Sequence, residues 1–244
     1  VEWDDRSDQF VAERRSQVGS ILLSKEPLVE VSEHARSTAL LGVVRKKGLA
    51  ILPWSPHLRQ WRARVMLLHD VAVESGEDVR WPDLSDEALL ANLEDWLLPY
   101  LGQVRRLEDF QQLDLKAILY SRLPWPLPLD LERLAPERMA VPSGSVLAID
   151  YSENPPVLAV KLQEMFGCEE SPSVADGKVA ILLHLLSPAQ RPLQVTADLA
   201  SFWRNGYQEV KREMRGRYPK HPWPDDPLQA VATRHTKRRL AGEN

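Results

Sequence analysis

Cysteine and metal-ligand patterns are scarce in this sequence of 244 residues. It contains a single cysteine, Cys168, so no internal disulfide can form, and this usage is typical of a protein in a reducing cytoplasm. The six histidines stand at positions 34, 57, 69, 184, 221 and 235, and no two have the i, i+4 spacing of helical zinc ligands. The sequence therefore predicts neither a disulfide framework nor a metal site.

Long apolar runs and nucleotide-binding motifs are also missing. The sequence has no stretch of about 18 apolar residues, so we expect no membrane partner, and its opening V-E-W-D-D-R does not resemble a signal peptide. It begins with Val1 rather than Met, which suggests a piece of a longer protein. The patterns G-x-x-x-x-G-K-[ST], G-x-G-x-x-G and G-x-S-x-G do not occur. We therefore expect no catalytic residue and no bound cofactor in this chain.

The titratable residues that remain are better explained as structural or solvated. Glu169 and Glu170 are adjacent, and adjacent carboxylates generally point apart into water rather than converge on a substrate. The same two charges disfavour the thiolate of Cys168, which argues against a nucleophile. His184 lies in an apolar run, so we expect a hydrogen-bonded core residue rather than a catalytic base.

Charge is divided unevenly along the chain. Hydrophobic residues make up 43% and charged residues 27%, which indicates a soluble globular protein of one or two domains. The formal charge is −4, but residues 196–244 hold ten Lys and Arg against six acids, a balance of +4 that leaves −8 for the rest. A basic end on an acidic body can bind phosphates or an acidic surface of its own protein, so charge alone does not decide the partner.

The most periodic stretch is a helix predicted from Thr196 to Arg217. Its apolar residues recur every three or four positions and form one stripe: Leu199, Phe202, Trp203, Tyr207, Val210 and Met214. Thr196 is a suitable N-cap, and Gly216 with Pro219 would end the helix. A basic ridge borders the stripe one step round the helix and consists of Arg204, Gln208, Lys211 and Arg215.

The segment from Gly216 to Pro227, G-R-Y-P-K-H-P-W-P-D-D-P, follows this helix, and we call it the strap. Its four prolines stiffen an extended backbone. The strap can pack on its own domain or form an exposed ligand-binding strip, and the first is favoured because large aromatic side chains usually pack. On an exposed strip, cations would meet phosphates and aromatics would stack on unpaired bases. The RNA-binding residues predicted on this basis are Arg204, Lys211, Arg215, Arg217, Lys220 and Trp223.

The rest of the chain divides into a helical and a mixed region, so the predicted fold class is α+β. Residues 1–30 are predicted to contain strands, at 9–15 and 18–25, and residues 32–123 to form a helical block in which Ser85 and Asp114 cap helices. The proline-rich seam 124–129 ends this block. Residues 137–227 are expected to form a small antiparallel sheet with two packed helices, and residues 228–244 a basic mobile tail.

Within residues 137–227 several elements are predicted in detail. A hairpin is expected over 138–141 and 145–151, followed by a helix from Pro156 to Gly167. Asp176 and Gly177 form a strong hairpin turn before the run K-V-A-I-L-L-H-L-L at 178–186. Continuous apolarity predicts a central strand covered on both faces, and residues 193–195 would form the last strand.

Several strings in this sequence resemble one protein family. They are L-P-W-S from Leu52, V-P-S-G-S from Val141, L-H-L-L-S-P from Leu183 and the strap itself. In this order they resemble the C-terminal region of the bacterial HrpB proteins, a family of DEAH-type ATP-dependent RNA helicases, over residues 1–239. The resemblance implies that the motor domains that bind ATP and Mg²⁺ lie upstream, outside this chain. It also implies that residues 1–30 close an oligonucleotide-binding-type barrel and that residues 32–239 form a family-specific C-terminal domain.

Two functions follow as hypotheses. The first is a non-catalytic accessory domain of an RNA helicase, which packs on the upstream helicase domains and helps hold single-stranded RNA along residues 204–223. The second is a protein-interaction or scaffold module with no direct nucleic-acid contact, in which the strap braces the domain and the basic ridge meets acidic protein surfaces.

Overall fold

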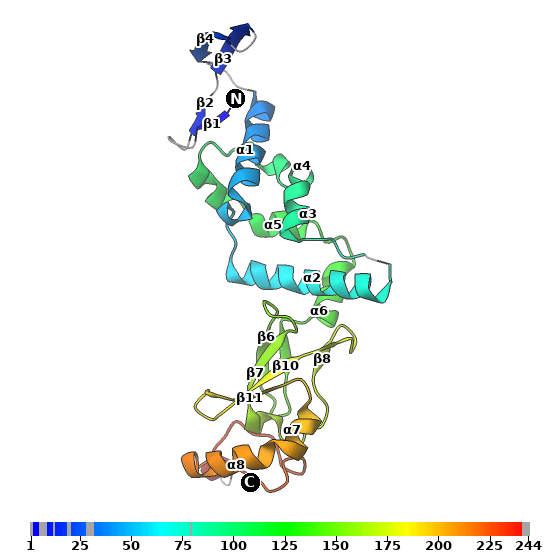
Figure 1. The fold of residues 1–244 in the computed structure, drawn as a ribbon. Coiled ribbons are helices and arrows are strands. Elements are labelled where there is room, and N and C mark those ends of the chain that lie inside the picture. Colours follow the sequence, from blue (N-terminus) through cyan, green and yellow to red (C-terminus); the bar gives the residue numbers. More distant parts are fainter. Residues whose placement is uncertain are drawn as a thin grey trace. The chain divides into compact units, whose positions relative to one another are not determined.

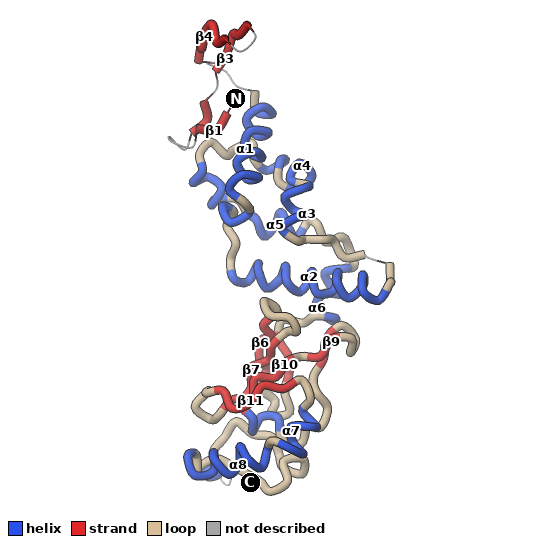
Figure 2. Tube along the Cα trace, in the orientation of Figure 1, coloured by secondary structure: helices blue, strands red, loops and turns tan. Residues whose placement is uncertain are grey.

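The computed structural model describes residues 2–4, 9–11, 13–18, 21–27, 32–78 and 80–240 (Figure 1). The chain divides into two compact units, residues 1–69 with 77–125 and residues 70–76 with 126–244. The first unit is helical apart from its amino-terminal strands, and the second combines a sheet with helices (Figure 2). These elements confirm the predicted α+β class.

The amino-terminal region forms two short antiparallel strand pairs. β1 (Glu2–Asp4) pairs with β2 (Gln9–Val11), and β3 (Glu13–Val18) pairs with β4 (Ile21–Pro27). The first strand predicted from the sequence, 9–15, is divided between β2 and β3. Each pair stands as a separate two-stranded sheet among the described residues, so a role in closing a barrel stays a prediction.

A run of helices follows, as predicted for residues 32–123. They are α1 (Glu33–Lys47), η1 (Leu49–Ile51), α2 (Pro56–Ser75), α3 (Asp86–Ala91), α4 (Leu93–Trp96), η2 (Leu98–Tyr100), η3 (Leu107–Gln112) and α5 (Leu115–Tyr120). Ser85 and Asp114 cap α3 and α5 with their side chains, as predicted. The apolar period after Ser85 also predicts one continuous helix to about Leu98, and this is wrong: Asn92 departs from helical geometry, and its side-chain amide donates to a backbone carbonyl of α3. Among the described residues, no helix is both long enough and apolar enough to cross a bilayer.

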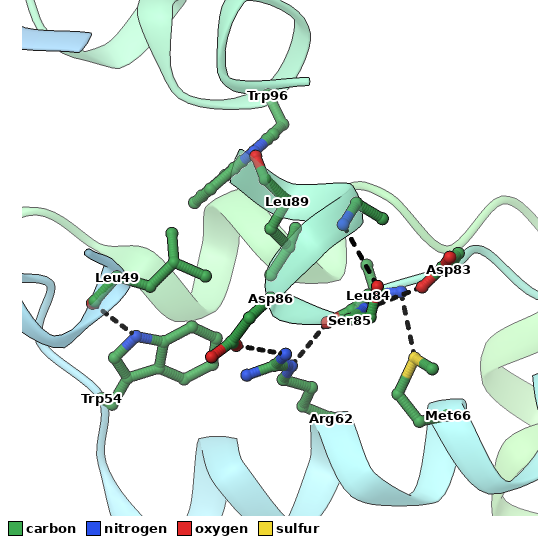
Figure 3. Close-up of polar contacts among 11 residues, drawn as sticks. Leu49, Trp54, Arg62, Met66, Asp83, Leu84, Ser85, Asp86, Leu89 and Trp96 are labelled. Carbon is green, nitrogen blue, oxygen red and sulfur yellow. Dashed lines mark hydrogen bonds and ion pairs between the residues drawn. The ribbon is translucent and has the colours of Figure 1, made fainter. Parts of the chain in front are cut away.

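An arginine and a tryptophan fasten α2 to the loops around it (Figure 3). Arg62 donates to the Leu84 carbonyl from Nε and to Asp86 from Nη2, each at 2.6 Å, and its guanidinium lies 5.2 Å from the Trp54 ring. The Trp54 indole donates to the Leu49 carbonyl at 3.0 Å. The L-P-W-S string therefore positions a ring that links η1, α2 and the start of α3.

The second unit is built on a five-stranded sheet. The helix α6 (Leu127–Leu134) precedes the sheet in the chain. The strand order is β11 (Pro192–Thr196), β10 (Leu182–Leu186), β7 (Val157–Lys161), β6 (Val146–Asp150) and β5 (Arg138–Ala140). A two-stranded hairpin, β8 (Ser173–Val174) with β9 (Val179–Ala180), turns at the predicted Asp176 and Gly177. The pair β10 and β7 is parallel, so the sheet is mixed rather than antiparallel throughout.

The helix predicted from Pro156 to Gly167 was wrong. Residues 157–161 form β7, and only the 3-10 helix η4 (Leu162–Met165) follows it. The apolar residues Leu158 and Leu162 fit a helical period, but Leu158 and Val160 also fit the period of a strand. Pairing with β10 decides between the two, and this partner is distant in the sequence.

The strand predicted over 178–186 is divided into β9 and β10, and one face of β10 is open. Leu183 and Leu185 are fully buried, whereas His184 on the opposite face is half-buried. The prediction of a strand covered on both faces was therefore wrong, and so was that of His184 as a core residue. Val146 and Val195 on the same open face are 51% and 48% exposed.

Candidate nucleic-acid interface

The helix that carries the predicted basic ridge is present but divided in two. It consists of α7 (Leu199–Asn205) and α8 (Tyr207–Arg217), which meet at Gly206. A Cβ at Gly206 would lie 2.9 Å from the Phe202 ring, so glycine permits this close contact at the break. The N-cap is Asp198, which accepts the Ser201 N–H at 2.8 Å, whereas the predicted cap, Thr196, ends strand β11.

The predicted apolar stripe is the buried face of these helices. Leu199, Phe202, Trp203, Tyr207 and Met214 are buried. The Trp203 ring lies 5.5 Å from Tyr207 in an edge-on contact, and its indole donates to a backbone carbonyl of the loop after η4 at 2.7 Å. The ridge residues therefore stand on a rigid support.

The strap packs on its own unit, which was the favoured interpretation. Trp223 is 7% exposed, and its indole donates to the Tyr218 carbonyl at 3.0 Å. The Tyr207 hydroxyl donates to the carbonyl of Pro224 at 2.9 Å, and the buried Gln163 amide donates to that of Pro222 at 2.6 Å. Because prolines lack an N–H, Pro222 and Pro224 can take part in backbone hydrogen bonds only through their carbonyls, and both carbonyls are used.

Lys211 contacts the strap and does not lie on the outer surface. Its side chain is buried, and its ammonium donates to the Asp225 carboxylate. This hydrogen bond and charge hold the pKa of Asp225 below its usual value, since they stabilise the ionised carboxyl. The structure thus gives Lys211 and Trp223 internal partners among the six predicted residues.

The other four predicted residues are exposed, and they are Arg204, Arg215, Arg217 and Lys220. Arg217 has Glu213 one turn away at 3.8 Å, a separation at which an exposed pair contributes little. Arg212, which the prediction omitted, is also exposed on α8. The surface of α7, α8 and the strap therefore presents guanidinium and ammonium groups, with the aromatic rings packed beneath.

Residues 228–240 of the segment predicted as a mobile tail make defined contacts with η4 and the strap, and residues 241–244 lie outside the described residues. The Thr233 N–H donates to the Gln163 carbonyl at 2.9 Å, and the Lys237 N–H donates to that of Lys220 at 2.9 Å. Lys237 begins the short helix α9 (Lys237–Leu240), and its side chain donates to the Pro219 carbonyl at 3.2 Å. The amino-acid composition of the tail carries little signal for these contacts, because they depend on backbone groups.

Two hollows border the sheet of the second unit. One, of about 480 Å³, lies on the open face and is bordered by Asp150, Glu153 and His184. The other, of about 300 Å³, is lined in part by Cys168, whose thiol donates to the Glu170 carbonyl. Burial raises the pKa of this thiol, which makes it a poor nucleophile at neutral pH. No group of three or more His, Cys, Asp or Glu side chains that could hold a metal ion occurs in the described part of the chain.

Comparison with known proteins gives consistent matches. The family model described as ATP-dependent helicase C-terminal matches residues 96–227, and that of the ATP-dependent RNA helicase HrpB connector region matches residues 1–28. The ATP-dependent RNA helicase HrpB of Escherichia coli (strain K12) is 45% identical over 239 residues, which cover 98% of this chain and 29% of that protein.

Two solved structures from E. coli are also similar. The DExH-box NTPase HrpB matches with a TM-score of 0.79 at 44% identity, over 96% of this chain and 29% of that one. The DEAH/RHA helicase HrpB matches with a TM-score of 0.68 at 43% identity, over 91% of this chain and 28% of that one. The chain therefore spans less than a third of the length of these relatives.

Proposed function

The chain belongs to the HrpB family of ATP-dependent helicase C-terminal regions, and on that premise we propose that it is a non-catalytic accessory region that holds single-stranded RNA. ATP and Mg²⁺ would be bound by the parts of the longer protein that this chain does not span, in the cytoplasm. RNA would leave or approach that motor along the surface of α7, α8 and the strap. The exposed side chains of Arg204, Arg215, Arg217 and Lys220 support this proposal.

The packing of the strap defines how RNA would be held. Because Trp223 and Tyr207 are buried, they are not available to stack on bases. Phosphate contacts remain, and they are strongly salt-dependent and nearly indifferent to sequence. We therefore expect weak sequence preference and an affinity that falls steeply as salt rises.

A salt titration tests this mode of binding. The variant Arg204→Ala with Arg215→Ala removes two exposed cations and leaves the strap contacts in place. Each phosphate contact to a single strand contributes about 0.7 to the slope of log K against log salt, so the slope should fall by about 1.4. Fluorescence anisotropy with labelled oligouridylate measures it. An unchanged slope and affinity would remove the support for RNA binding.

A second candidate function is packing on the upstream helicase domains of the same protein, through the open sheet face. The exposed Val146 and Val195 favour it, because an apolar sheet face that is open in this chain can be covered by another part of the longer protein. Val146→Lys with Val195→Lys should then weaken association with the separately purified upstream part in size-exclusion chromatography. Val231→Lys, at a site that is 84% exposed and outside the sheet, is the control. Equal elution of the two variants would exclude this face.

A further inference from the structure

We infer that the basic run R-H-T-K-R-R at residues 234–239 is a fixed part of the phosphate-binding surface, placed beside the strap by Gln163. This inference rests on the proposed RNA binding and extends its surface to residues that the sequence prediction assigned to a mobile tail. The occupant is the phosphate backbone of single-stranded RNA. The tail then acts as a second cationic row rather than as a loose basic arm.

Gln163 is the residue that holds both segments. It is 3% exposed, and it lies in η4 beneath the strap. Its side-chain amide donates to the Pro222 carbonyl at 2.6 Å, while its own carbonyl accepts the Thr233 N–H at 2.9 Å. Thr233 is itself 4% exposed. A single buried residue therefore fixes the strap and the tail relative to each other.

The neighbouring glycine shows how closely the tail is packed. Gly167 has a φ of +75°, in the left-handed region, and its N–H donates to the Pro227 carbonyl at 2.9 Å. A Cβ built on Gly167 would lie 3.3 Å from the Ala230 carbonyl oxygen. The chain after the strap thus passes against the η4 loop instead of extending into solvent.

The consequence is a cationic cluster drawn from two segments. The hydrogen bond from the Lys237 N–H to the Lys220 carbonyl, at 2.9 Å, sets the two lysines side by side. Arg238 follows, and its side chain is exposed. The acids Asp225 and Asp226 lie between these two lysines in the sequence, and the carboxylate of Asp225 is paired with Lys211. RNA phosphates that contact Lys220 would therefore also contact the tail cations. Because the tail is already held in place, binding would not carry the entropy cost of ordering it.

Two variants of the 244-residue chain test this inference with labelled oligouridylate. Lys237→Ala with Arg238→Ala removes two charges, and the salt slope should fall by about 1.4. Arg122→Ala with Arg191→Ala removes two exposed charges elsewhere and should leave the slope unchanged. Equal slopes for the two double variants would overturn the inference.

Gln163→Leu removes the side-chain amide that donates to the Pro222 carbonyl, and it keeps every charge of the chain. The strap and the tail are then held less firmly, so RNA must order the same cations when it binds. We therefore expect the affinity for RNA to fall about three- to tenfold while the salt slope stays unchanged. Amide hydrogen exchange at Lys237, whose acceptor Lys220 lies in the strap, should be slow in the parent and faster in this variant. Fast exchange in the parent, or unchanged affinity in the variant, would show a loose arm and overturn the inference.

Failure of this inference and failure of the proposed function give different results. If Arg204→Ala with Arg215→Ala lowers the slope and the tail variant does not, the surface binds RNA without the tail. If neither variant changes binding, RNA is not held by this region at all. Both outcomes contradict the fixed cationic row.

Discussion

Replacing Trp223 by alanine should destabilise the second unit and leave the first unit unchanged. The indole is 7% exposed and donates to the Tyr218 carbonyl at 3.0 Å, so the change leaves a void and removes a hydrogen-bond donor. Loss of a buried Trp side chain costs about 3–5 kcal/mol. The other anchors of the strap, from Gln163 and Tyr207, do not involve the indole. We therefore place the cost near the lower limit, at about 3 kcal/mol.

Hydrogen exchange resolves the two units separately. A loss of about 3 kcal/mol raises the population of the opened unit more than a hundredfold, so amides of β10 that exchange through this opening should be faster by that factor. Amides of α1 should keep the parental rate. Trp125→Ala is the matched control, because that ring is 75% exposed and its loss should cost less than about 0.5 kcal/mol. If Trp223→Ala behaves like the control, the strap does not stabilise the unit, and the reasoning is refuted.

Three further changes test other features. Gly167→Ala places a residue with a side chain at φ +75°, in the left-handed region, and brings its Cβ against the Ala230 carbonyl. The urea midpoint should therefore fall by an amount equivalent to about 1–2 kcal/mol. A parental midpoint would contradict this close approach. Burial and the charge of Lys161 lower the pKa of His221, so the free energy of unfolding should be highest above the ordinary pKa of 6.5 and should decrease as the pH falls below it. His221→Gln should flatten this pH dependence in urea titrations. Identical profiles for the parent and the variant would exclude His221 as the cause. Arg62→Ala removes a 2.6 Å hydrogen bond to the Leu84 carbonyl and an ion pair with Asp86, and it should lower the free energy of unfolding of the helical unit by about 1–3 kcal/mol. Amide hydrogen exchange in α3 should then be faster. Unchanged exchange there would show that these contacts do not stabilise the unit.

Local signals in the sequence predicted the local features well. Ser85 and Asp114 were identified as N-caps because a short polar side chain before an apolar period has few other roles. The packing of the strap, which includes Trp223, was also predicted, because a large aromatic ring is costly to leave in water. Both predictions depend on residues close in sequence.

Features that depend on distant partners could not be predicted in this way. The segment with Leu158 has both helical and strand periods, and its parallel pairing with β10 decides the outcome. Lys211 belongs to the basic ridge by spacing, yet its side chain is buried and pairs with Asp225 in the strap. The tail was expected to be mobile because a basic run carries no apolar period. Its observed contacts use backbone N–H groups, which every non-proline residue has, so composition does not reveal them.

The bond between Gln163 and Thr233 has a consequence for biosynthesis. Gln163 leaves the ribosome well before Thr233, so its buried carbonyl waits for a donor that is translated later. The second unit can complete its packing only after that donor has emerged. A premature stop codon between the strap and Thr233 would therefore leave a nascent product whose interior polar group is unsatisfied, and such a product is a natural target for chaperones and proteases.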